Sequence, residues 1–302
     1  MARSVSALIA IVAASVLLTA PASALRAAAD AQAPANQLPM EPPRDFGTSI
    51  TPSMEGWFEN PDGTKTFIVG YLNRNSKVEV DVPIGENNKI EPGGPDYGQP
   101  THFMTRRQLG MFTITVPKDF GQSRLTWSIT VNGRTNAIPL KLVPDYVLQP
   151  FKDIAVGNTP PIIRFSPNGQ TIQGPIATLS RALEMKAKVG VPLPITMWAV
   201  DDGKYTSGSN AQPRNLPPPV ELQWSKYRGP GDVKFDARSP KVTVEAGGPI
   251  GAEFKGNAIT NVTFSAPGDY VLHLNVDDFS GRGSGETGCC WTTALVKVSV
   301  TP

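Results

Sequence analysis

The sequence predicts an all-β protein, with two β-sandwich modules joined by a Pro-rich connector after a cleaved signal peptide. Pro (30) and Gly (28) are frequent and follow no period, which is typical of short strands linked by many turns. Apolar and polar residues alternate in many segments, whereas helical periodicity is nearly absent. The 302 residues are enough for about two domains, and 40% hydrophobic against 18% charged residues favours packed cores.

The first 24 residues have the features of a secretory signal peptide. Arg3 precedes an uncharged apolar run from Val5 to Ala20, and Ala22-Ser23-Ala24 forms an A-x-A cleavage site. A membrane anchor is the alternative, but the run is shorter than the ~20 residues that span a bilayer. We therefore expect a bacterial protein that is periplasmic or secreted, with no membrane insertion after cleavage. The Ala/Pro-rich residues 25–47 predict a flexible tether.

The charge balance argues against some classes of partner. The formal net charge is +2, and cleavage would remove Arg3 and leave +1. Nucleic-acid-binding and anionic-membrane-binding proteins carry clustered basic residues. Here the charges are scattered, so we expect no nucleic-acid partner.

Alternating strands define a first module at residues 48–145. Three groups of apolar residues repeat every second position, at Val78, Val80 and Val82, at Phe112, Ile114 and Val116, and at Leu125, Trp127, Ile129 and Val131. Phe67, Val69 and Tyr71 predict a further strand. Asn132-Gly133 suits the positive φ angles of a type I′ turn, so we expect a hairpin that continues through Ile138, Leu140 and Leu142.

A Pro-rich connector at 146–175 precedes a second module at 176–302. Its strands are marked by Ile195 and Met197, Leu222 and Trp224, Val242 and Val244, and Val262 and Phe264. In the next strand Tyr270, Leu272, Leu274 and Val276 point inward, while Val271, His273 and Asn275 point outward. Ala294, Val296, Val298 and Val300 close the module. Residues 177–188 suit a helix or a strand, and Pro192 and Pro194 indicate a strand that starts late or lies at a sheet edge.

The second module resembles the PKD and related immunoglobulin-like families. The resemblance depends on WSKYRGPGDVKF (Trp224–Phe235), TFSAPGDYVLHLNVDD (Thr263–Asp278) and the closing strand Ala294–Val300. It implies a core tryptophan at Trp224 and a tyrosine corner at Tyr270. Leu272 stands where an antibody domain has a cysteine, so no inter-sheet disulfide is expected.

Acidic residues end two strands of the second module. Asp201-Asp202 ends one and Asp277-Asp278 ends the other, and the loops that leave those strands emerge at the same end of an immunoglobulin-type fold. With Glu286 as a fifth carboxylate, the cluster predicts a calcium site, since calcium takes six to eight oxygen ligands. The alternative is that these residues cap tight turns through their own backbone. No other cofactor is expected.

Cys289 and Cys290 are the only cysteines. Adjacent Cα atoms lie ~3.8 Å apart, below the usual disulfide range, so a bond between them would be strained. Three alternatives stay open, namely a vicinal disulfide, unreacted thiols and a bridge to another chain. Strand alternation points Cys290 into the core and Cys289 outward.

A long loop of the first module, Pro83–Gln108, is a candidate binding surface. It contains Tyr97, His102, Phe103, Arg106 and Arg107, and aromatic rings beside guanidinium groups suit a sugar or a peptide. The alternative is a solvated loop with a few residues packed inward. The segment PIGENNKIEPGGPDYGQPTHF (Pro83–Phe103) resembles uncharacterised exported bacterial proteins, which implies an exported location and no assigned activity.

The functional prediction is an exported, non-catalytic binding or scaffolding protein whose partner is a protein or a glycan. The sequence has two histidines, His102 and His273, and none of the common hydrolase or phosphate-binding motifs. One alternative is an accessory subunit of a periplasmic enzyme. Another is a hydrolase that uses the Asp cluster, for which alanine at Asp201 and Asp277 would remove activity.

Overall fold

The computed structural model describes residues 42–154, 157–204, 220–246, 253–278 and 289–302. Over these residues the protein is all-β, as predicted, with mainly antiparallel sheets and two single 3₁₀ turns. No helix in the described part is long and apolar enough to cross a membrane. The predicted signal peptide 1–24 and most of the predicted tether lie outside the described residues.

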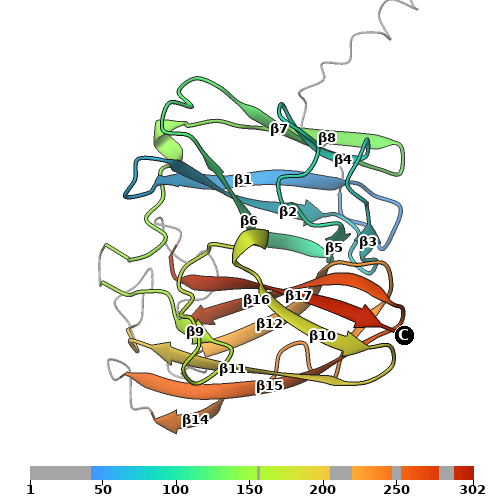
Figure 1. Ribbon diagram of the computed structural model, residues 1–302. Helices are drawn as coiled ribbons and strands as arrows, with labels where there is room; N and C mark the ends of the chain where they lie inside the picture. Colours follow the sequence, from blue (N-terminus) through green and yellow to red (C-terminus); the bar gives the residue numbers. More distant parts are fainter. Residues whose placement is uncertain (1–41, 155–156, 205–219, 247–252, 279–288) are drawn as a thin grey trace, which may run out of the picture. The chain divides into compact units, whose positions relative to one another are not determined.

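The N-terminal half contains the first eight strands (Figure 1). They are β1 Ile50–Glu59, β2 Lys65–Asn73, β3 Val80–Asp81, β4 Asn88–Glu91, β5 His102–Phe103, β6 Arg106–Val116, β7 Leu125–Val131 and β8 Arg134–Leu140. They form the sheets β1-β2-β6 and β4-β7-β8, with β3 and β5 as a separate pair. The alternating apolar residues of β2, β6 and β7 are buried between these sheets, as their spacing predicted.

The Asn132-Gly133 turn joins β7 to β8 as predicted. Asn132 has φ 52° and Gly133 has φ 73°, the signs that a type I′ turn requires. Val131 pairs with Arg134 across the turn, and the pairing continues to Leu125 and Leu140. The Asn132 side chain also donates to the Thr48 carbonyl at 2.9 Å, which ties the hairpin to the start of the half.

The C-terminal half is a second pair of sheets. Its strands are β9 Ile162–Arg164, β10 Leu183–Lys188, β11 Leu193–Asp201, β12 Val220–Arg228, β13 Val233–Phe235, β14 Thr243–Ala246, β15 Phe254–Phe264, β16 Gly268–Asp278 and β17 Trp291–Thr301. One sheet has the order β10-β17-β16-β12, and the other has the order β13-β15-β11-β9, with β14 beside β15. Only β10 and β17 pair in parallel among these described strands.

Trp224 and Tyr270 are core residues of this half, each 1% exposed. The Trp224 ring lies 6.4 Å from the ring of Phe235, and the Tyr270 ring lies 4.8 Å from that of Phe264. The Tyr270 hydroxyl donates to the Ala266 carbonyl at 2.9 Å, so it ties the turn before β16 to its own strand. These contacts give the pair the positions that the sequence resemblance implied.

Several local predictions need correction. Val78 is 41% exposed and precedes β3, because the chain there is pinned at Ser76 and Lys77 by backbone bonds to Arg44 and Asp45. Residues 177–188 are not a helix; they form a 3₁₀ turn, Leu179–Arg181, followed by β10. The other 3₁₀ turn is Pro144–Tyr146.

The connector region and the proline-containing strand also differ in detail. The predicted connector contributes β9, which pairs with Trp198–Val200 of β11. β11 begins at Leu193 and is central in its sheet, yet Pro194 lies beyond the reach of β9. Because no residue of β9 lies opposite Pro194, the N–H that proline lacks costs no hydrogen bond to β9.

The outer face of the sheet β10-β17-β16-β12 is buried, contrary to the prediction for β16. His273 and Asn275 are each 1% exposed, and Val271 is 8% exposed. Tyr227, Val271 and Leu295 belong to the same apolar cluster as the core of the N-terminal half. Within residues 42–302 the two halves therefore pack directly on each other, and we call this contact the seam (Figure 1).

Candidate functional site

The segment Pro83–Gln108, predicted as one long loop, instead contains β4, β5 and the start of β6. The loop proper is the stretch 92–101 between β4 and β5, and it lies at the seam, where β12 holds it in place. The Tyr227 hydroxyl donates to the Gly98 carbonyl, and the Tyr227 carbonyl accepts from the Thr101 N–H at 3.1 Å. Arg228 donates to both carboxylate oxygens of Asp96, at 3.0 and 2.8 Å, and to the Gln99 carbonyl. A bidentate guanidinium fixes both position and orientation, so this part of the loop is a rigid surface.

Gln99 stabilises the same loop from within. Its side chain is fully buried, its Oε1 accepts from the Tyr97 N–H at 2.8 Å, and its Nε2 donates to the Pro95 carbonyl at 2.6 Å. The Tyr97 hydroxyl donates to the Pro92 carbonyl. The Tyr97 ring is thereby held at a set angle beside the seam.

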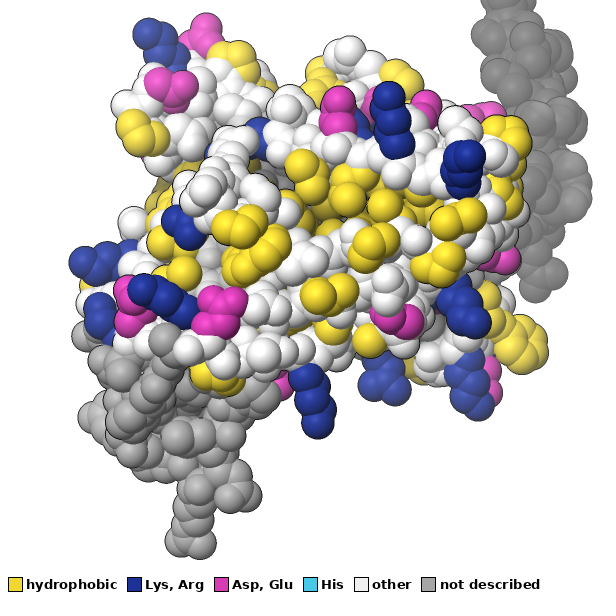
Figure 2. Space-filling view, turned by 60° about the horizontal axis from the view of Figure 1, so that its bottom comes forward, with side chains coloured by type: hydrophobic (Ala, Val, Ile, Leu, Met, Phe, Trp, Pro, Cys, Tyr) yellow, Lys and Arg dark blue, Asp and Glu magenta, His cyan; other side chains and the backbone are white. Residues whose placement is uncertain are grey.

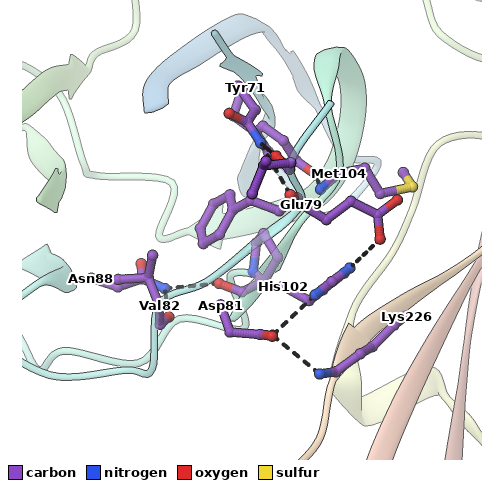
Figure 3. A network of polar contacts seen from close by, with 12 residues as sticks. Tyr71, Glu79, Asp81, Val82, Asn88, His102, Met104 and Lys226 are labelled. Carbon is purple, nitrogen blue, oxygen red and sulfur yellow. Dashed lines mark hydrogen bonds and ion pairs between the residues drawn. The ribbon is translucent and has the colours of Figure 1, made fainter. Parts of the chain in front are cut away.

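A charged network joins the halves next to this loop (Figure 3). His102 contacts Asp81 through Nδ1 and Glu79 through Nε2, both at 3.0 Å. From the other half, Lys226 donates to the same oxygen of Asp81 at 3.1 Å, and Arg238 donates to Glu79 at 2.6 and 3.2 Å. The hydrogen bond from His102, together with Arg238, lowers the pKa of Glu79 to about 2. Glu79 is therefore ionised at neutral pH.

A hollow of about 530 Å³ opens beside the loop, and we call it the β6 hollow. Three segments line it, namely Asp96–Gly98 of the loop, Thr113–Thr115 of β6 and Ala177–Ser180, which follow the connector. The lining consists mostly of hydroxyl groups and apolar atoms with one aromatic ring. Its one carboxylate, Asp96, is already paired with Arg228.

A second hollow of about 630 Å³, the β10 hollow, lies on the other side of Leu179. Leu179 lines both hollows, and the second is otherwise lined by Glu184, Met185 and Lys186 of β10, Asp269, Tyr270 and Val271 of β16, and Lys297, Val298 and Ser299 of β17. Its charged side chains are of both signs. Figure 2 shows hydrophobic side chains gathered in a band on one face of the molecule, with Lys, Arg and acidic side chains around them.

The structure does not gather the five predicted loop residues into one site. Phe103 is fully buried and packs on Tyr71 with 4.9 Å between the ring centroids. His102 is 8% exposed and belongs to the network of Figure 3. Arg106 and Arg107 are exposed on β6, where Arg107 pairs with Glu55 at 2.7 Å. Of the five, Tyr97 alone lines the β6 hollow.

The site residues predicted from the sequence do not include four residues of the seam, namely Lys226, Tyr227, Arg228 and Leu179. A signal was present in two strands, because Tyr270-Val271-Leu272 and Ala294-Leu295-Val296 are apolar at consecutive positions. A strand with one wet face alternates, whereas a strand buried on both faces is continuously apolar. These runs indicate that another part of the protein covers the outer face of the sheet β10-β17-β16-β12.

The four described acidic residues predicted to bind calcium differ in burial and in hydrogen-bond partners. Asp201 and Asp278 are buried, at 2% and 3% exposed, while Asp277 accepts from the Asn275 side chain at 2.7 Å. Asp202 accepts from the Thr159 N–H and hydroxyl at 3.1 and 2.9 Å. Within the described ranges no group of three or more His, Cys, Asp or Glu side chains could hold a metal ion. Glu286 lies outside these ranges, so the calcium site stays a prediction.

Asp278 and Asp202 contact the connector, whereas Asp201 caps its own turn. Asp278 accepts from the Asn158 side chain at 2.6 Å, and Asp201 accepts from the Gly203 N–H at 2.9 Å. Burial, with the nearby charges of Asp278 and Asp202, raises the pKa of Asp201 to about 7. The hydrogen bond from the Gly203 N–H to Asp201 caps a tight turn, which was the alternative to a calcium site.

Cys289 and Cys290 form a disulfide with each other in the structure. Both are 1% exposed, and both Sγ atoms contact the Asn158 carbonyl, at 3.8 and 3.6 Å. The expectation that Cys289 points outward is therefore wrong. The connector residue Asn158 covers the position that strand alternation alone would leave exposed.

The comparisons with known proteins show no family for this chain. No family model matches the chain, and no curated protein matches it. Among solved structures, the chain is similar to the crystal structure of domains 4 and 5 of the S-layer protein SbsC, with 12% identity over 84% of this chain and 98% of that chain. The TM-score is 0.19, which is too low to support any argument about fold or function. The class is therefore the one that the structure itself defines, an all-β protein of sandwich type.

Proposed function

We propose that this chain is an exported, non-catalytic binding protein that presents the β6 hollow to a protein or a glycan. A signal-peptide-like N-terminus supports export to the periplasm or the medium. The PKD-like sequence of the C-terminal half supports a role in extracellular recognition, since such sandwich modules present loops and faces to partners.

The β6 hollow is the observation that carries this proposal. Its volume of about 530 Å³ falls in the ~300–1,000 Å³ range of ligand sites. Its lining offers the Tyr97 ring and the hydroxyls of Thr115, Thr178 and Ser180, which can donate and accept hydrogen bonds. The loop that forms one wall is rigidly held by Gln99 and Arg228, so little ordering entropy is lost on binding.

Site-specific photocrosslinking in the host envelope tests the proposal. A photoreactive amino acid at Ser180, in the wall of the hollow, is expected to yield one discrete adduct. The same amino acid at Lys255, an exposed residue of β15, serves as the control and is expected to yield none. Equal labelling from both positions, or none from Ser180, would contradict a ligand in the β6 hollow.

The stoichiometry of the adduct separates two forms of this function. A single protein captured in equal amount with the chain would identify an accessory subunit of that partner. Glycan-containing adducts, or retention of the protein on purified peptidoglycan sacculi, would identify a glycan-binding scaffold.

A further inference from the structure

The edge of β6 is the feature of the hollow that points to one class of ligand. In the described sheet β1-β2-β6, β6 pairs with β2 on one side, and its other side is the edge that faces the hollow. Thr113 is 4% exposed, whereas Thr115, two residues along the same edge, is exposed. The edge is thus covered at one position and open at the next.

Thr113 is covered by Ala177, which lies just after the connector. The Thr113 N–H donates to the Ala177 carbonyl at 3.2 Å, so this N–H points away from β2. The chain then turns into the 3₁₀ segment Leu179–Arg181 and continues as β10 in the other half. The chain thus makes one bond to β6 at Ala177 and then turns away from it.

The direction of the next main-chain groups follows from strand geometry. The register between β2 and β6 is regular from Lys65↔Val116 to Val69↔Phe112. In a regular antiparallel strand, residues two apart point their N–H and C=O groups to the same side. The N–H and C=O of Thr115 therefore face the hollow, as the N–H of Thr113 does.

We infer that the ligand of the β6 hollow is an extended polypeptide segment that adds to the edge of β6 as a further strand, an inference that rests on the proposed function. An open strand edge presents donors and acceptors at the spacing of another main chain. A glycan has no main-chain groups at that spacing. The observations therefore favour a polypeptide over a glycan.

The lining indicates the character of that segment. The one charged residue among the described lining residues, Asp96, is neutralised by Arg228, while the partly exposed Leu179 supplies apolar contact. An uncharged segment with small, hydroxyl or aliphatic side chains fits these walls. Proline at the paired positions would not fit, because it lacks the N–H that the edge must receive.

Proline at position 115 tests the inference. Thr115→Pro removes the outward N–H and leaves the bonds to β2, which come from the alternate residues, in place. Thr115→Val keeps the N–H and changes the side chain alone. Ala137→Pro is the matched control, since Ala137 is exposed on β8, the edge strand of the sheet β4-β7-β8.

The probe is a library of random peptides displayed on phage and selected against the mature protein. A synthetic peptide from the selection is expected to bind Thr115→Pro about tenfold more weakly, because one main-chain hydrogen bond is lost. The same peptide is expected to bind Thr115→Val and Ala137→Pro within about threefold of the unmodified protein. Hydrogen exchange of the Thr115 amide in the unmodified protein is expected to slow when the peptide binds, a readout that does not depend on a variant that folds.

Peptides that bind equally to Thr115→Pro and leave the Thr115 amide unprotected would overturn the strand-addition inference but leave the proposed binding function intact. Failure to select any peptide, together with retention on peptidoglycan sacculi, would replace the polypeptide by a glycan. Absence of any adduct from Ser180 would instead overturn the proposed function itself.

Discussion

At the scale of single residues, Asp201 shows how burial changes a side chain that the sequence places in an acidic cluster. Its carboxyl group is 2% exposed, and its Oδ2 has no hydrogen-bond partner among the described residues. Desolvation of this kind disfavours the charged form, which is why the pKa rises to about 7. The residue was predicted as a calcium ligand, and the structure shows a buried acid at the end of β11.

Asp201 predicts a pH dependence of stability. An unfolded aspartate has a pKa near 3.8, so between about pH 4 and pH 7 the folded chain keeps a proton that the unfolded chain has released. The free energy of unfolding should therefore fall as the pH rises through this window. The fall is at most ~1.4 kcal/mol for each unit by which the pKa of the folded state exceeds that of the unfolded state. Asp201→Asn should flatten this slope in urea unfolding curves at pH 4 to 7. The exposed control Asp119→Asn should keep it, and equal slopes for both variants would contradict the assignment.

The two cysteines give a second prediction at this scale. Each is 1% exposed under the connector residue Asn158. A thiol reagent should therefore label neither residue in the native protein, and should label both once the protein is unfolded and reduced. Mass spectrometry counts the labels. Labelling of the unfolded protein without reduction would show free thiols, and a mass twice that of the chain under non-reducing conditions would show a bridge between chains.

At the scale of elements, the β7–β8 hairpin is determined by its own two turn residues. Gly133 has φ 73°, and a Cβ added there would meet no atom within 4 Å. Gly133→Ala should therefore destabilise the protein by about 1 kcal/mol through backbone conformation alone. Thermal unfolding measures this loss. A neutral effect would show that the turn changes type at little cost.

The contact of β12 with β3, unlike the hairpin turn, depends on residues that are far apart in the sequence. Lys226, whose side chain is 7% exposed, donates to Asp81 at 3.1 Å. Lys226→Met keeps the aliphatic stem and loses the ion pair. The free energy of unfolding should fall by only about 1 kcal/mol, because Asp81 is 57% exposed and water screens the pair. Lys255→Met, in a surface pair with Glu253, is the control and should change stability by less than about 0.5 kcal/mol.

At the scale of the whole molecule, the seam turns two sandwiches into one unit within residues 42–302. Tyr227, Val271 and Leu295 of the C-terminal half belong to the apolar core of the N-terminal half. The Tyr227 ring also stacks on His273, with 5.9 Å between the centroids. Separation of the halves would expose these side chains to water.

Unfolding should accordingly be a single cooperative transition. Each half alone would lose the burial of the shared residues, at ~25 cal/mol per Å² of apolar surface, so neither half should persist after the other unfolds. Differential scanning calorimetry checks this, with equal calorimetric and van't Hoff enthalpies expected. Two resolved transitions would show that the seam contributes little to stability.

The sequence by itself determined the all-β class, most strands of both halves, and the Asn132-Gly133 turn, because these depend on alternation and on local φ preferences. It also placed Tyr270 in the core, since alternate positions of one strand share one face. These features are local in the chain, and a single sequence records them well.

Only the tertiary structure shows the seam and which of the predicted site residues are buried. Phe103 entered the core, His102 joined a network with Lys226, and Tyr97 came to line a hollow with β6 and residues 177–180. Asp201 and Asp278 were buried, and His273 was covered. The physical reason is that alternation tells which two faces a strand has, but not what packs against the second face. That depends on contacts between segments more than a hundred residues apart, such as Asp96 with Arg228.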